Sequence, residues 1–394
     1  MRDFDQSWRS RLADLSGLGR LRQLAESRRL PDGRVERDGE ILLDFSSNDY
    51  LGLARHPELK RRSAEFLDRW GAGSGASRLV TGNLPPFAAI ETKLAHGKGA
   101  EAALVLASGF QANAGLLPAL LDATVWGREP VVLADRLNHA SLIHGAQAAG
   151  AKQIRFRHND MGHLEDLLIR HARQEGRICF IVTETVFSMD GDRADLAALK
   201  ALADRHDAFL YLDEAHATGV LGPGGFGLAH GLAGTNCLVM GTFSKALGSF
   251  GAYAACSAAL KEYLVNRCAA LIYATALPPA TLGAMDAALD LIPGMEAERA
   301  RLSANAERFR RRMIGAGADC GASSTQIVPL MAGEEQAALD LAARLRQAGM
   351  LAIAIRPPTV PPGGSRLRFA FAAQHEARDI DRLADILTEI REAA

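Results

Sequence analysis

The sequence predicts an α/β fold, in which a large domain with a mostly parallel sheet is joined to a smaller α+β domain at the C-terminal end. Short β-branched runs alternate with Ala/Leu-rich stretches through the middle of the chain, as is typical of strand–helix–strand units. This pattern changes between residues 278 and 293. The 394 residues also exceed the roughly 100–200 of one typical domain. We therefore expect an N-terminal arm over 1–45, a large domain over 46–285 and a small domain over 286–394.

The elements are expected in the following order. The first 40 residues are charged, and an amphipathic helical pattern lies around residues 8–30. Apolar spacing suits crossover helices over 164–174 and 195–206, and a long charged helix over 297–313 leads into the small domain. A strand over 367–372 and a last helix over 379–393 end the chain. The strands of the large sheet are expected at 103–107, 131–134, 178–183, 208–212, 238–241 and 252–256.

Composition excludes several classes of protein. Lys and Arg total 45 and Asp and Glu total 46, so the balance argues against a nucleic-acid binder. The five cysteines form no CxxC pair, and three lie in strand-like apolar runs, which favours buried thiols. Neither a signal peptide nor a membrane-spanning run is evident, so we expect a reduced cytoplasmic compartment and no membrane. Asp160, Asp190 and Asp192 do not suggest a metal site, since Asp and Gly are common in turns.

Four of the predicted strands end in chemically reactive side chains. The carboxyl ends of parallel strands meet at one edge of a sheet, where ligands of α/β proteins bind. One polar residue at a strand end is common, but four such ends together indicate a ligand site. In chain order the pairs are Asp135 with His139, Glu184 with Ser188, Asp213 with His216, and Thr242 with Lys245.

Lys245 lies among small residues directly after an apolar run, a setting that a solvated loop lysine does not need. Pyridoxal phosphate (PLP) chemistry requires a lysine for the aldehyde and a carboxylate for the pyridine nitrogen, and Asp213 supplies the carboxylate. His216 is placed to bond the phenolic oxygen of the cofactor, and His139 to lie against its ring. The alternatives are an ordinary loop lysine, a histidine that caps a turn and a structural histidine.

The segment Ser108-Gly109-Phe110 follows a strand and begins an Ala/Leu-rich helix. Free N–H groups and the dipole at a helix start suit a phosphate. The alternative is a plain turn in which Ser108 caps the helix. Thr242 and Ser244, close to the lysine, are further hydroxyl donors for the same phosphate.

A proline-rich loop over 355–369 carries three arginines, Arg356, Arg366 and Arg368. Guanidinium groups on a stiff loop suit recognition of a carboxylate. Arg368 alternates with apolar neighbours, so we expect it to point away from their face and toward a cleft between domains. The alternative is a surface hairpin with three solvated arginines.

Together these motifs resemble the α-oxoamine synthases, a family of fold-type-I PLP enzymes. The resemblance runs from residue 44 almost to the C-terminus, and its motifs are DFSSNDYLGL at 44–53, GSGASR at 73–78, SGF at 108–110, VFSMDGD at 186–192, DEAH at 213–216 and IYAT at 272–275. The run IRPPTVP at 355–361 is similar to that of members that join L-alanine to a pimeloyl thioester, on CoA or acyl-carrier protein (ACP), in biotin biosynthesis.

Ser244 departs from the glycine that some of those members have before the lysine. It keeps open a sister synthase of the 2-amino-3-ketobutyrate CoA ligase or serine palmitoyltransferase type. A non-catalytic sensor domain with the same fold is a further alternative, but it has no reason to keep Lys245, His139 and Arg368 together.

The resemblance also implies a role for each matching residue. Lys245 would hold PLP as a Schiff base and later act as acid and base at Cα, with His139, Asp213 and His216 as the other catalytic residues. The enzyme would be a homodimer with shared active sites, in which Thr275 reaches the phosphate bound by the neighbouring subunit. The implied cofactor-binding residues are Gly109, Phe110, His139, Glu184, Ser188, Asp213, His216, Thr242, Lys245 and Thr275. The implied substrate-binding residues are Arg22, Asn48, His139, Thr359 and Arg368.

Overall fold

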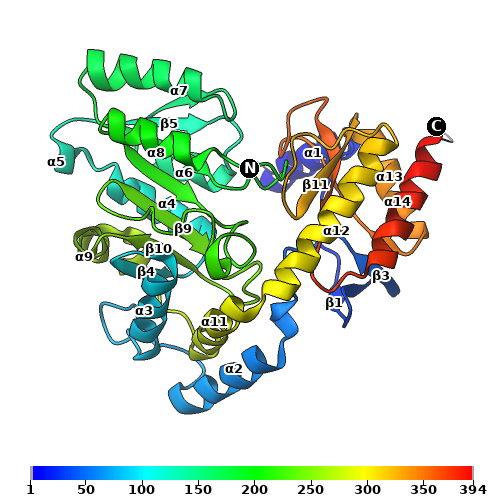
Figure 1. Cartoon of the computed structure of the whole chain (residues 1–394), viewed down its shortest axis with the longest axis horizontal. Coiled ribbons are helices and arrows are strands. Elements are labelled where there is room, and N and C mark those ends of the chain that lie inside the picture. The colour runs from blue at the N-terminus through cyan, green and yellow to red at the C-terminus, as the bar shows by residue number, and fades with distance from the viewer. Residues whose placement is uncertain (1–2, 393–394) are drawn as a thin grey trace. The chain divides into compact units, whose positions relative to one another are not determined.

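The computed structural model describes residues 3–392, which form two compact units. Unit 1 contains the described residues up to 48, residues 189–191 and those from 301 onward. Unit 2 contains residues 49–188 and 192–300. The chain therefore enters unit 1 for three residues in its middle and then returns to unit 2. Figure 1 shows the elements of both units.

Unit 2 is built on a seven-stranded sheet with the strand order β4-β10-β9-β8-β7-β5-β6. β10 is antiparallel to both of its neighbours, and the other adjacent pairs are parallel. The prediction of a mostly parallel sheet is thus confirmed. The edge strand β6 was not predicted, because lysine, glutamine and arginine interrupt its apolar pattern. The strands are β4 (Ala102–Leu106), β5 (Val131–Asp135), β6 (Lys152–Phe156), β7 (Cys179–Glu184), β8 (Phe209–Asp213), β9 (Cys237–Thr242) and β10 (Ala252–Cys256).

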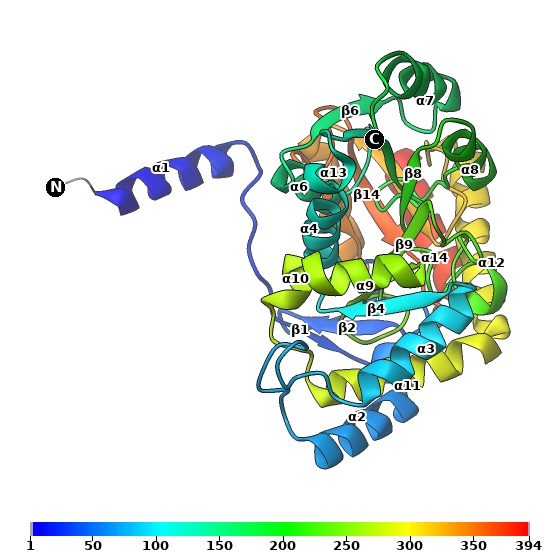
Figure 2. The ribbon, with the colours of Figure 1, turned by 90° about the vertical axis from the view of Figure 1, so that its left-hand side faces the viewer.

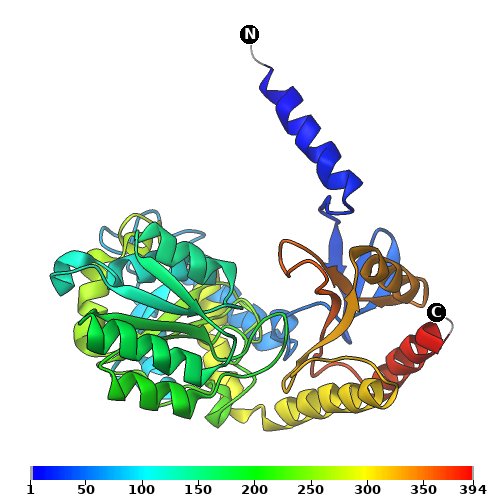
Figure 3. The same cartoon turned by 90° about the horizontal axis from the view of Figure 1, so that it is seen from above.

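Helices cover both faces of this sheet (Figures 2 and 3). One core joins Leu116 and Leu117 of α4 to Met240 and Ala254 of the sheet, and these side chains are fully buried. Burial of each leucine or methionine side chain contributes about 1.5–3 kcal/mol, which makes the sheet a firm base for the loops at its edge. The helices are α2 (Pro57–Trp70), α3 (Pro86–Lys98), α4 (Gly109–Leu120), α5 (Ala123–Trp126), α6 (Ala140–Ala148), α7 (Met161–Leu168), α8 (Leu196–Arg205), α9 (Ala258–Arg267), α10 (Ala269–Ile272) and α11 (Pro279–Leu291).

The crossover helices predicted in unit 2 are present. The one predicted over 195–206 is α8. The one predicted over 164–174 is split between α7 and a π-helical turn, Ile169–Gln174. The predicted strand positions agree with β4, β5, β7, β8, β9 and β10 to within one residue at each end.

Unit 1 contains two smaller sheets. In the first, β1 (Ser27–Arg29), β2 (Arg34–Arg37) and β3 (Glu40–Asp44) are joined by β12 (Met350–Leu351), which is parallel to β3. In the second, β14 (Ser365–Ala370) lies between β11 (Ile327–Gly333) and β13 (Ile353–Ile355). The remaining α-helices are α1 (Phe4–Gly17), α12 (Glu296–Gly315), which belongs to unit 1 from Arg301 onward, α13 (Glu335–Gln347) and α14 (Ala377–Glu392). The predicted helix over 297–313 is α12; that over 379–393 is α14, although residue 393 lies outside the described residues.

The predicted N-terminal helix around residues 8–30 was wrong in extent. α1 ends at Gly17, Gly19 takes a left-handed φ of 64° that ends helical geometry, and residues from Ser27 form a strand. α1 buries none of its side chains, and it stands away from the β1 strand that follows it (Figure 3). Phe4 and Trp8 are 62% and 63% exposed.

The cysteines and aspartates have structural surroundings. All five cysteines are free and buried, and burial raises the pKa of Cys237 to about 12. Asp160 caps α7, Asp190 pairs with Arg366 at 2.5 Å, and Asp192 bonds His158. Within residues 3–392 there is no group of three or more His, Cys, Asp or Glu that could hold a metal ion. In the same part of the chain no helix has the length and apolar character needed to cross a membrane.

Candidate active site

The four predicted strand ends lie at one edge of the unit 2 sheet. β5, β7, β8 and β9 are parallel neighbours. In register, Glu184 lies opposite Asp213, and Asp213 lies opposite Met240. The turns that follow these strands therefore carry their reactive side chains to a common edge, as predicted.

Lys245 lies in the turn after β9 and contacts a histidine directly. Its Nζ is 2.6 Å from Nε2 of His216, and the other ring nitrogen, Nδ1, is 2.7 Å from the hydroxyl of Tyr50. His216 is buried, and both of its ring nitrogens bond side chains of the site. It is therefore more than a histidine that caps a turn, and it orients the amine of Lys245.

Asp213 ends β8 as a buried carboxylate held by two neutral donors. Its Oδ1 accepts a hydrogen bond from the backbone N–H of Ala215 at 2.9 Å. Its Oδ2 accepts one from Nδ2 of Asn113, also at 2.9 Å. A carboxylate can accept more than two hydrogen bonds, so this group fits a protonated ring nitrogen. The buried carboxylate of Asp213 is thus suited to pair with the ring nitrogen of PLP.

His139 and Glu184 lie next to this carboxylate. His139 caps α6, and its backbone N–H donates to Oε1 of Glu184 at 2.6 Å. Burial lowers the pKa of His139, the charge of Asp213 opposes this effect, and the charge of Lys245 adds to it. Burial, with the charge of Asp213, raises the pKa of Glu184 well above its ordinary value. Both groups therefore favour their neutral forms.

A place for a phosphate exists where α4 begins. Ser108 caps this helix, and its Oγ accepts a hydrogen bond from the N–H of Gln111 at 3.3 Å. Gly109 and Phe110 occupy the first turn, where backbone N–H groups lack helical partners. A Cβ on Gly109 would lie 3.8 Å from Cβ of Thr242, so the hydroxyl of Thr242 adjoins this turn. The start of α4 can therefore be capped by Ser108 and also bind a phosphate. Ser188, the remaining predicted cofactor residue of this unit apart from Thr275, is buried just after β7.

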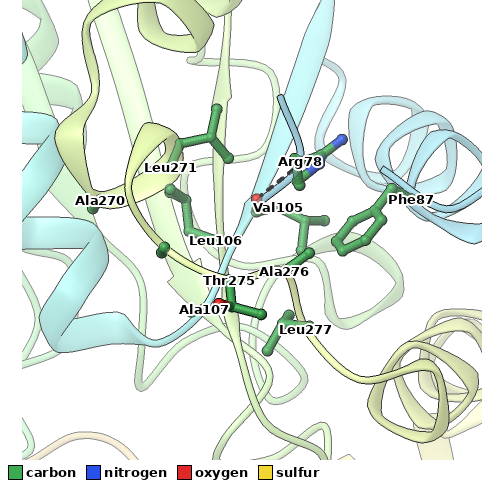
Figure 4. Close-up of a pocket in the computed structure, with 11 residues that line it drawn as sticks. Arg78, Phe87, Val105, Leu106, Ala107, Ala270, Leu271, Thr275, Ala276 and Leu277 are labelled. Carbon is green, nitrogen blue, oxygen red and sulfur yellow. Dashed lines mark hydrogen bonds between the residues drawn. The ribbon is translucent and has the colours of Figure 1, made fainter. Parts of the chain in front are cut away.

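Thr275 lies on an exposed segment that pairs with the GSGASR loop through a bridge to Ser77. Both adjoin a small cavity of about 20 Å³ (Figure 4). Arg78 donates to the carbonyl oxygen of Val105 at 3.2 Å and bonds the buried Glu91 at 2.5 Å. Arg78 thus anchors the loop that supports Thr275.

Apart from His139, the predicted substrate residues lie in unit 1 as two bonded pairs. Nη2 of Arg368 donates to Oδ1 of Asn48 at 3.1 Å, and Nη2 of Arg22 donates to Oγ1 of Thr359 at 3.3 Å. Arg366 and Arg368 are only 7% and 6% exposed, so the alternative of solvated arginines is wrong for these two. Arg22 and Thr359 also line a pocket of about 440 Å³.

Four residues in or beside the predicted site were given no role by sequence reasoning. Asn113 links Asp213 to Ser141, whose Oγ is 2.7 Å from Nδ1 of His139. The one signal for Asn113 was its place one helical turn after Gly109, and Ser141 follows His139 by two residues. The four residues are Tyr50, Asn113, Ser141 and Tyr211.

His158 joins the end of β5 to the segment that follows β7. Its Nδ1 is 2.9 Å from Oδ1 of Asp135, and its Nε2 is 2.7 Å from Oδ2 of Asp192. Asn159 bonds both carboxylates as well. Partial burial lowers the pKa of His158, but the two carboxylates outweigh this effect and raise the pKa to about 9. The imidazolium therefore bridges the turn that bears His139 and the segment that follows Ser188.

This bridge predicts a pH-dependent stability. The folded-state pKa of about 9 exceeds the unfolded value near 6.5, so the stabilisation is complete below about pH 6.5 and is lost as the pH rises through 9. Across this window the free energy of unfolding of the native chain should fall by roughly 1–2 kcal/mol relative to His158→Gln, a figure discounted for partial solvent exposure. Urea titrations at several pH values measure it. His163→Gln is the control and should keep the native slope; equal slopes for His158→Gln and the native chain would disprove the bridge.

The chain matches the family model of aminotransferase class I and II over residues 40–387. It is 58% identical to a protein of Paramagnetospirillum magneticum provisionally named 8-amino-7-oxononanoate synthase, over 100% of both chains. It is 55% identical to the 8-amino-7-oxononanoate synthase of Gluconacetobacter diazotrophicus, over 99% of this chain and 98% of that one. Among solved structures, a serine palmitoyltransferase with its PLP internal aldimine has a TM-score of 0.90 at 25% identity, over 100% of this chain and 99% of that one.

The chain therefore belongs to the aminotransferase class I and II family, and it has the fold of a solved PLP enzyme, serine palmitoyltransferase. Within that class, its full-length identity places it in the family of the 8-amino-7-oxononanoate synthases.

Proposed function

We propose that this chain uses PLP to join L-alanine to a pimeloyl thioester, on CoA or ACP, with release of CO2 and the free thiol. The product is 8-amino-7-oxononanoate, and the reaction belongs to biotin biosynthesis in the cytoplasm. The observation that carries the proposal is the 2.6 Å contact between Lys245 Nζ and His216 Nε2, beside the buried Asp213. The identities of 58% and 55% to relatives of that name support the choice of substrates.

The side chains of this protein would have the following roles in the reaction. PLP, when bound, supplies an electron sink for the carbanion at Cα of the amino acid. Asp213 holds a proton on the pyridine nitrogen, and His216 bonds the phenolic oxygen. Lys245 holds the cofactor, removes the Cα proton and later returns one. The start of α4 at Gly109 and Phe110, with Ser188 and Thr242, holds the phosphate, and Glu184 lines the site.

The substrates would meet arginines and hydroxyls. Arg368, oriented by its bond to Asn48, binds the carboxylate of the amino acid. Arg22 and Thr359, which bond each other, contact the acyl substrate. His139 donates a hydrogen bond to the carboxylate or the thioester oxygen and so supports charge where it develops.

The functional form would be a homodimer in which Thr275 reaches the phosphate bound by the partner. Exposed apolar residues beside the Thr275 segment support this proposal: Tyr273 is 84% exposed, Val80 72% and Leu79 51%. Large apolar side chains that gather on a surface mark protein interaction sites.

A matrix of amino acids and acyl-CoAs tests the proposed substrates. Purified protein with PLP is mixed with alanine, glycine, serine or threonine and with pimeloyl-, acetyl-, succinyl- or palmitoyl-CoA, and free thiol and product mass are recorded. We expect the highest kcat/KM for alanine with pimeloyl-CoA. Preference for serine with palmitoyl-CoA, which Ser244 and the solved serine palmitoyltransferases keep open, or for glycine with acetyl-CoA would replace this proposal.

A further inference from the structure

A continuous series of hydrogen bonds, buried at Tyr211, Asn113 and Ser141, leads to His139. The hydroxyl of Tyr211 is 2.6 Å from Oδ1 of Asn113. Nδ2 of Asn113 is 2.8 Å from Oγ of Ser141, and that Oγ is 2.7 Å from Nδ1 of His139. Asn113, Ser141 and Tyr211 are essentially inaccessible to solvent. Water therefore does not compete for the bonds among these three residues, and their direction is set by the groups themselves, whereas His139 lies at the exposed end of the series.

The chemistry of Asp213 determines which group donates and which accepts in each of these hydrogen bonds. Asn113 lies 2.9 Å from Oδ2 of Asp213, and a carboxylate accepts hydrogen bonds, so the amide must turn its NH2 group toward it. The second N–H of that group then donates to Ser141. The amide oxygen faces Tyr211, whose pKa is raised well above its ordinary value by burial and the nearby Asp213, so the phenol keeps its proton and donates it.

Two donors consequently converge on Nδ1 of His139. Ser141 accepts a hydrogen bond from Asn113, which leaves its own hydroxyl proton for Nδ1. The backbone N–H of Ser141 points at the same nitrogen, at 3.2 Å. A proton on Nδ1 would point at the hydrogen of that backbone N–H, and the two hydrogens would repel each other. Nδ1 is therefore an acceptor, and the neutral ring carries its proton on Nε2.

We propose that Asn113 and Ser141 are positioning residues that hold His139 as a neutral imidazole protonated on Nε2, so that it acts as a hydrogen-bond donor. The ligand that would receive this bond is an anionic or carbonyl oxygen, and this part rests on the proposed function. One amide, Asn113, thus couples the carboxylate that pairs with the cofactor nitrogen to the histidine that lies against the cofactor ring.

The charges around His139 agree with a neutral ring. Asp213 at the end of β8 favours the imidazolium, whereas Lys245 after β9 opposes it. Glu184 at the end of β7 accepts the backbone N–H of His139 and favours its own neutral form. Burial also disfavours the imidazolium, and the pKa of His139 lies below its ordinary value.

Nitrogen NMR of the PLP-loaded protein tests the proposal directly. The chain has 11 histidines, so ¹⁵N-histidine labelling gives a tractable spectrum, and the signal lost in His139→Gln assigns the ring. We expect Nδ1 of His139 to be unprotonated and Nε2 protonated between pH 6.5 and 8. A protonated Nδ1 in this range would overturn the proposal. The readout does not involve the substrates, so it stands apart from the outcome of the substrate matrix.

Ser141→Ala supplies the second test. Without the hydroxyl, the neutral ring loses a donor, so the midpoint of its titration should rise above that of the native protein. With the substrates that the matrix selects, the ratio of kcat/KM at pH 6 to kcat/KM at pH 8 should then be lower than in the native protein, because a larger share of the rings is protonated at pH 6. Ser257→Ala removes another buried serine that caps a helix, far along the chain in α9, and should show the native midpoint and pH profile. A native midpoint in Ser141→Ala would overturn the role of the hydroxyl.

Discussion

Replacing Lys245 by alanine is expected to abolish turnover and the visible absorption band of the lysine-linked cofactor. Nζ of Lys245 is the one amine that contacts His216 at 2.6 Å in the described structure, and the proposed reaction requires it both to hold PLP and to move the Cα proton. Loss of a group with both tasks should lower kcat by more than about 10³-fold. The absorption spectrum and the release of thiol from pimeloyl-CoA in the presence of alanine measure the two effects.

Lys200→Ala is the matched control, because Lys200 is a surface lysine paired with Asp204 on α8. It should keep both the absorption band and the native rate. If Lys245→Ala still released thiol in an alanine-dependent way, the assignment of Lys245 would be wrong.

Replacing Lys98 by methionine is expected to give the largest loss of stability. Lys98 is fully buried and paired with Glu214, whose Oε1 also accepts the backbone N–H of Ala229 at 2.8 Å. Burial alone lowers the pKa of Lys98, but Glu214 and Tyr253 outweigh it and raise the pKa, so the pair is ionic. Removing one partner leaves a buried charge without compensation and should cost about 3–5 kcal/mol in urea unfolding.

The double variant Lys98→Met with Glu214→Gln separates charge from packing. Glutamine keeps an acceptor for Ala229 and carries no charge, so the double variant should be more stable than Lys98→Met alone. Lys200→Met at the surface should change stability by less than about 1 kcal/mol. A Lys98→Met protein as stable as the native chain would show that the buried pair does not stabilise the fold. Because Glu214 follows Asp213 directly, this pair also anchors the turn that leads to His216.

The sequence allowed the large sheet and its reactive edge to be predicted. Strands buried on both faces read as continuous apolar runs, which is why β5, β7, β8 and β9 were located to within one residue at each end. Since parallel strands share one edge, the placement of Asp213 and Lys245 near each other followed from their positions after these runs. The sequence pattern missed β6, an edge strand with polar side chains.

Features that depend on tertiary contacts could not be read from local pattern. The two-residue strand β12 exists because it pairs with β3, more than three hundred residues earlier. The return of residues 189–191 to unit 1 depends on Gly191, whose carbonyl accepts hydrogen bonds from Ser324 and Thr325. The roles of Asn113 and Ser141 likewise appear only when α4 and α6 lie side by side. The secondary-structure propensity of a segment does not show which distant segment it will contact.

The combination of L-alanine with pimeloyl-CoA tests the central claim most directly. Purified, PLP-loaded protein should convert this pair to a product with the mass of 8-amino-7-oxononanoate, with one thiol and one CO2 released for each product. With alanine labelled at its carboxyl carbon, all of the label should leave as CO2. Retention of that label in the product, or turnover only with another amino acid and acyl chain, would contradict the proposed function.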